Sequence, residues 1–90
     1  MGLDIVETFM AIESTFAIEI PDAMAPYLST VGAVYDFVVT HVEPTPGFAR
    51  PGAYDGAFWE RYLDVLERET GAPRVALKPN ARFVQDLGMD

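Results

Sequence analysis

The chain of 90 residues contains no cysteine, which excludes disulfides, thiolate metal sites and cysteine nucleophiles. It also has no apolar run close to the roughly 20 residues that a membrane-spanning helix needs. Its first residues lack the basic segment that opens a secretory signal. We therefore expect a cytoplasmic protein with no membrane attachment.

Positive charge is scarce and unevenly placed. The net charge is −8, and residues 1–43 contain seven acidic residues but no lysine or arginine. Such a negative field repels nucleic-acid phosphates and anionic lipid, and it favours basic protein partners. We accordingly exclude nucleic-acid binding, although an ordinary solvated acidic face is the alternative interpretation.

Residues suited to catalysis are few. His41 is the sole histidine, and its place near an expected helix end indicates a helix-terminal or surface role. Ser14 and Ser29 have no nearby base, so a serine nucleophile is not expected. The acids of residues 1–22 are spaced as on a solvated helix face and form no calcium loop. The sequence predicts neither a catalytic residue nor a metal site, and we expect that the protein is not an enzyme.

Hydrophobic spacing predicts four helices, over residues 3–16, 23–28, 31–40 and 57–70, and no strand. Asp22, Thr30 and Asp55 are the expected N-caps, and Gly71 is the expected stop of the last helix. Residues 43–56 are rich in proline and glycine and form the expected linker. Residues 73–90 are expected to be an ordered loop. The residues expected to be buried include Val6, Phe9, Ile12 and Phe16, then Val31, Val34, Tyr35 and Val38, then Phe58, Trp59, Tyr62, Leu63, Val65 and Leu66, and in the tail Val75, Leu77, Phe83, Val84 and Leu87.

Two parts of this sequence resemble the acyl carrier protein family, in reversed order. The first part resembles that family's second half, with its helices II, III and IV, in Gly2-Leu3-Asp4-Ile5-Val6-Glu7, Phe16-Ala17-Ile18-Glu19-Ile20-Pro21-Asp22, Ser29-Thr30-Val31-Gly32 and Tyr35-Asp36-Phe37. The stretch Asn80-Ala81-Arg82-Phe83-Val84-Gln85-Asp86-Leu87-Gly88-Met89-Asp90 resembles the end of its first half. Joined end to start, the two termini restore the family's D-L-G-x-D-S-L-D signature, except that Gly2 replaces the serine.

This resemblance implies an all-α, acyl-carrier-protein-like four-helix bundle that is circularly permuted. Residues 1–90 would form one domain, in which residues 1–42 carry helices II to IV, residues 43–56 the linker, and residues 57–90 helix I and the long loop. We expect the halves to close within one chain as a monomer. A swapped dimer is the alternative closure.

The resemblance also implies a function. In the family, the serine carries 4′-phosphopantetheine, and the acidic helix II docks on basic patches of partner enzymes. Gly2 has no hydroxyl, so the chain as written would hold no cofactor. The implied partner-binding residues are Leu3, Asp4, Glu7, Met10, Glu13 and Asp90. The expected function is an acidic module that docks biosynthetic or transferase enzymes. The alternative is a true acyl or aminoacyl carrier whose serine is lost at the permuted N-terminus.

Overall fold

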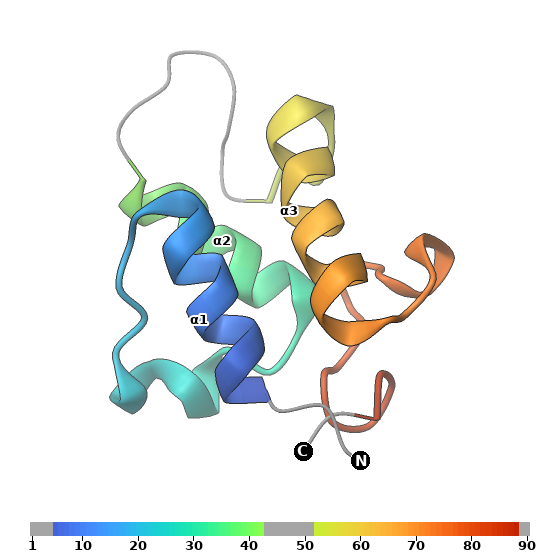
Figure 1. The fold of residues 1–90 in the computed structure, drawn as a ribbon, viewed down its shortest axis with the longest axis horizontal. Helices are drawn as coiled ribbons and strands as arrows, with labels where there is room; N and C mark the ends of the chain where they lie inside the picture. The colour runs from blue at the N-terminus through green and yellow to red at the C-terminus, as the bar shows by residue number, and fades with distance from the viewer. Residues whose placement is uncertain (1–4, 43–51, 89–90) are drawn as a thin grey trace.

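A computed structural model of the chain describes residues 5–42 and 52–88, and in these ranges it is helical. The α-helices are α1 (Ile5–Phe16), α2 (Val31–His41) and α3 (Gly56–Thr70) (Figure 1). The 3₁₀ helix η1 (Asp22–Tyr27) lies between α1 and α2, and a second one, η2 (Arg74–Ala76), follows α3. The described parts contain no strand, only an isolated bridge between Thr30 and Arg82. The predicted all-α fold class is therefore confirmed, although the short second helix is 3₁₀ rather than α.

Local sequence signals explain where α2 and α3 begin and end. Thr30 is extended, and its hydroxyl accepts a hydrogen bond from the Ala33 N–H at 3.1 Å, as an N-cap does. Gly71 ends α3 in the left-handed conformation (φ 72°), and its N–H donates to the Glu67 carbonyl. Both caps were predicted correctly. Asp55 also occupies the predicted N-cap position of α3, but its side chain makes no capping hydrogen bond.

The core forms between the inner faces of the three α-helices, with α1 packed against α3 (Figure 1). Tyr35 of α2 lies at its centre, with its ring 4.7 Å from that of Trp59 and 5.1 Å from that of Tyr62. The Tyr62 hydroxyl donates to the Val31 carbonyl at 2.7 Å, which satisfies a buried polar pair. Burial raises the pKa of the Tyr62 phenol well above its usual value.

The C-terminal segment runs back to the start of α2. Phe83 donates its N–H to the Ser29 carbonyl at 3.0 Å, and the Val31 N–H donates to the Ala81 carbonyl at 2.9 Å. Close approach at Gly32 accompanies these bonds, because an added Cβ there would lie 2.8 Å from the Pro79 carbonyl oxygen. This segment therefore completes the bundle beside α1 and α2.

The linker meets the bundle at α2. The Asp36 carboxylate accepts hydrogen bonds from the Tyr54 hydroxyl at 2.9 Å and from the Gly52 N–H at 2.8 Å. Tyr54 is half-buried against the core, as an ordered linker end would be. The rest of the predicted linker, residues 43–51, lies outside the described residues.

Three predicted core residues are exposed instead. Val6 lies on the outer side of α1, because the inner stripe is filled by Phe9, Ile12 and Phe16. Val75 lies on the single turn η2, which buries no residue, and Val84 follows the buried Phe83 in a tight turn that directs it outward. The predictions for these three valines were wrong, whereas Leu77 and Phe83 are buried as predicted.

Candidate functional site

The outer side of α1 combines exposed apolar and acidic side chains. Val6 and Met10 are 57% and 59% exposed, one helical turn apart, and the exposed Glu7 lies beside them. The Glu7 side chain makes no hydrogen bond or ion pair within the described part of the chain. We call Val6, Glu7 and Met10 the α1 face. Neighbouring exposed apolar side chains among charges are typical of a protein-binding surface.

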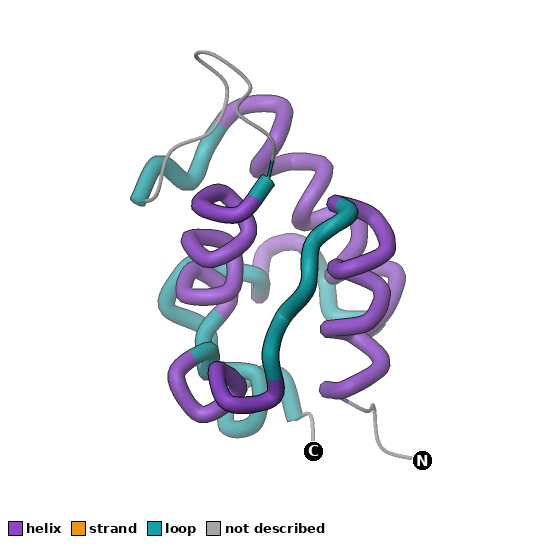
Figure 2. Tube along the Cα trace, turned by 90° about the vertical axis from the view of Figure 1, so that its left-hand side faces the viewer, coloured by secondary structure: helices purple, strands orange, loops and turns teal. Residues whose placement is uncertain are grey.

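A groove of about 310 Å³ lies beside α1, and Val6 and Met10 of the α1 face line part of it. One wall is α1, and the other is the connector between α1 and η1, which runs back alongside the helix (Figure 2). Because the groove has mostly apolar walls and includes Met10, it enlarges the apolar surface around the α1 face that a partner could cover. The groove is lined by Ile5, Val6, Phe9, Met10, Glu13, Ile20 and Pro21.

Glu13 holds this groove in shape. Its carboxylate oxygen Oε2 accepts a hydrogen bond from the Ile20 N–H at 2.7 Å, across the turn that ends α1. That turn contains Ala17 in the left-handed region (φ 56°), a conformation that costs free energy for a residue with a Cβ. Glu13 therefore fixes the connector in place, a role that its predicted use as a docking acid did not anticipate.

The acids of α3 have a different environment. Arg74, on η2, pairs through Nη1 with Glu60 and through Nη2 with both Asp64 and Glu67. The hydrogen bonds that Arg74 donates to Glu67 and to Asp64 raise the pKa of Arg74. Residues 5–42 contain five acidic residues and no lysine or arginine. Arg61 of α3 reaches the C-terminal end of α1, where it contacts the Thr15 carbonyl and the Phe16 ring, but among the described residues no ion pair holds Glu7.

Comparison with known proteins identifies relatives for part of the chain. It is 49% identical over 42 residues to the acyl carrier protein of Clostridium acetobutylicum, and 46% identical over 42 residues to that of Clostridium perfringens. It is 49% identical over 40 residues to the acyl carrier protein of Wolinella succinogenes. Over this part, the chain is similar to acyl carrier proteins. These matches cover 44–47% of this chain and 53–55% of each relative, so the chain spans about half the length of the curated relatives. No protein-family model and no solved structure matches it.

The structure places only some of the site residues that the acyl carrier protein resemblance implied. Glu7, Met10 and Glu13 all lie on α1, with Glu7 and Met10 exposed together and Glu13 turned toward the connector. The other implied residues lie outside the described residues: Gly2, Leu3, Asp4 and Asp90. Val6 is the member of the α1 face that the sequence analysis missed, because helical spacing assigned it to the core.

The described residues of this acyl carrier protein relative show neither a metal centre nor a membrane span. Residues 5–42 and 52–88 contain no group of three or more metal-ligating side chains. Within the same ranges no helix is both long and apolar enough to cross a bilayer. His41 is exposed at the end of α2, where its Nδ1 lies 2.9 Å from the Phe37 carbonyl oxygen, so its predicted helix-terminal position is confirmed.

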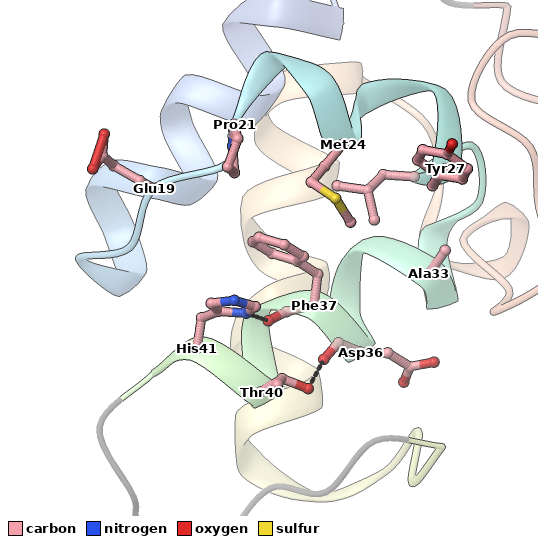
Figure 3. Close-up of a pocket in the computed structure, with 10 residues that line it drawn as sticks. Glu19, Pro21, Met24, Tyr27, Ala33, Asp36, Phe37, Thr40 and His41 are labelled. Carbon is pink, nitrogen blue, oxygen red and sulfur yellow. Dashed lines mark hydrogen bonds between the residues drawn. The ribbon is translucent and has the colours of Figure 1, made fainter.

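A larger and more open groove, of about 650 Å³, separates η1 from α2. Met24 and Phe37 point toward each other across it, and the Phe37 ring stacks on His41 with centroids 4.0 Å apart (Figure 3). Of its two acids, Glu19 and Asp36, the latter is already bonded to Tyr54 and Gly52. Helical spacing did not predict this groove, although the position of Phe37 outside the predicted inner stripe of its helix was a usable signal.

Proposed function

We propose that this protein is an acyl-carrier-protein-like module that docks a basic surface of a partner protein through the α1 face. The observation that carries the proposal is the exposed Glu7, which has no ion-pair partner among residues 5–42 and 52–88, beside the exposed Val6 and Met10. The acid would guide a basic partner to the helix, and the two apolar side chains would be buried on contact. The partner class that fits this surface is a biosynthetic or transferase enzyme with a basic patch.

We also propose that the two halves of the carrier-protein fold occur in reversed order along this chain. Two observations support a permuted bundle. First, the C-terminal segment packs against α1 and the start of α2, where the family's first half would meet its second. Second, an alignment follows chain order, so a permuted chain can match its relatives over only one half at a time, and each match covers about half.

The residues present do not fit attachment of phosphopantetheine. The position that corresponds to the family's serine is Gly2, which has no hydroxyl to form the phosphodiester. Ser14 lies on the exposed side of α1, and the backbone of Ser29 is bonded to the C-terminal segment. We infer that the chain as written docks partners without carrying a cofactor.

A true carrier is the second candidate function, and the 46–49% identity to acyl carrier proteins favours it. In that case the serine has been lost at Gly2, where the two halves of the family's sequence would join. Incubation with a phosphopantetheinyl transferase and coenzyme A tests both candidates by intact-protein mass. We expect no mass gain for the chain as written, and a gain of one phosphopantetheine for a rejoined Gly2→Ser chain in which residues 57–90 precede residues 2–42.

Docking can be mapped on the whole chain without knowing the natural partner. The probe is a synthetic amphipathic helix of leucine and lysine, titrated into ¹⁵N-labelled protein. We expect the largest amide shift changes within α1, from Ile5 to Glu13, and weaker binding by Glu7→Gln. Shift changes spread evenly over all helices would show that only net charge attracts the probe, and the docking proposal would be wrong.

A further inference from the structure

A single arginine connects three acids on the outer side of α3. Glu60, Asp64 and Glu67 are spaced four and three residues apart, so they lie along one side of the helix. Arg74 reaches back over them from η2: Nη1 lies 2.5 Å from Glu60 Oε1, and Nη2 lies 2.5 Å from Glu67 Oε1 and also contacts Asp64. Every acid in this row therefore shares one guanidinium.

Without Arg74, this side of α3 would present three uncompensated acids, against the single acid of the α1 face. Glu60 and Asp64 have side chains that are 59% and 64% exposed, so both remain reachable from solvent. A single ion pair at such exposure contributes little to folding stability, but three that share one guanidinium form a network that holds Arg74 over the row. The network therefore affects which ligands this surface attracts as well as how η2 is held against α3.

We propose that Arg74 restricts the docking of basic partners to the α1 face by occupying the carboxylates of α3. This inference rests on the proposed docking function. A lysine or arginine of a partner that approaches Glu60, Asp64 or Glu67 must displace a fixed guanidinium and meets its positive charge. At Glu7 it meets no competitor within the described residues. Specificity is a difference between two affinities, and Arg74 lowers the affinity of the wrong surface.

The test compares the whole chain with Arg74→Gln, using the leucine–lysine helix as probe and ¹⁵N amide shifts as readout. The wild-type chain should show shift changes in α1 and none along residues 60–67. Arg74→Gln should add shift changes at Glu60, Asp64 and Glu67, and strengthen total binding by roughly two- to fivefold, the range that an exposed ion pair of this kind supplies. Arg74→Lys, which keeps the charge, should resemble the wild type.

A second pair of variants leaves Arg74 in place, so the test does not depend on the folding of Arg74→Gln. Glu7→Gln and Glu60→Gln change the net charge equally and both alter an exposed acid. We expect weaker probe binding for Glu7→Gln and unchanged binding for Glu60→Gln. Equal weakening by both, or unshifted α3 amides in Arg74→Gln, would overturn the role of Arg74. Absence of shift changes in α1 of the wild type would instead overturn the proposed function itself.

Discussion

The ring of Phe83 meets the ring of Phe9 edge to face, with centroids 6.2 Å apart and ring planes at 79°. Phe9 belongs to the first helix of the chain, and Phe83 belongs to the C-terminal segment. Phe83 is fully buried, so this contact joins the two ends of the described chain inside one core. The permuted bundle that we propose depends on this contact.

Truncation of Phe83 should therefore be costly. Phe83→Ala removes a buried aromatic ring and its contact with Phe9, so we expect the free energy of unfolding to fall by about 3–5 kcal/mol. The matched control is Val84→Ala at the next residue, which is exposed. This variant should change the free energy of unfolding by less than about 0.5 kcal/mol. Urea unfolding followed by tryptophan fluorescence measures both. Similar, small losses for the two variants would mean that the C-terminal segment does not belong to the core.

Two buried tyrosines should respond oppositely to loss of their hydroxyls. Tyr62→Phe removes the hydroxyl that donates a hydrogen bond to the buried Val31 carbonyl. We therefore expect the free energy of unfolding to fall by about 1–2 kcal/mol. The Tyr35 hydroxyl is buried and has no hydrogen-bond partner in the described structure. Tyr35→Phe removes this unsatisfied group, and stability should stay constant or rise by about 1 kcal/mol. Thermal unfolding of the two variants at pH 7 measures both effects. A larger loss of stability for Tyr35→Phe than for Tyr62→Phe would contradict this account.

Burial of these phenols also predicts how stability depends on pH. Burial raises the pKa of Tyr62 well above 10, and burial together with Asp55 and Asp36 raises that of Tyr35. Above the unfolded-state pKa the unfolded chain loses these protons first, so the folded state holds more protons. Stability should thus be constant through neutral pH and fall as the pH rises above about 10. Chemical unfolding at pH 8, 10 and 11 checks this, and Tyr62→Phe should show a shallower decline.

Glu13 offers a test of how the groove beside α1 is maintained. Glu13→Ala removes the acceptor of the Ile20 N–H, so we expect a loss of about 1–3 kcal/mol and faster hydrogen exchange at Ile20. Glu13→Gln keeps a side-chain carbonyl acceptor and should recover most of the protection. If the Ile20 amide exchanges equally fast in the wild type and in Glu13→Ala, the carboxylate does not fix the connector.

Local sequence signals predicted much of the fold. The Thr30 cap, the Gly71 stop and the inner stripe of α2 each depend on neighbouring residues, and each was correct. Val6 was assigned to the core wrongly, because helical spacing leaves the width of the buried stripe undetermined. The roles of Glu13 and Arg74 could not be predicted, since each depends on how a loop returns to a helix.

The central claim, docking through the α1 face, is tested most directly by the association rate of the leucine–lysine helix with two charge-reversed chains. Glu7→Lys and Glu69→Lys change the net charge equally, one on the α1 face and one on α3. At about 0.05 M salt we expect Glu7→Lys to slow association several-fold and Glu69→Lys to have little effect. The difference should shrink near 0.5 M salt, where exposed charges are screened within a few ångströms. Equal slowing by both variants at low salt would contradict the claim and leave net charge as the sole attraction.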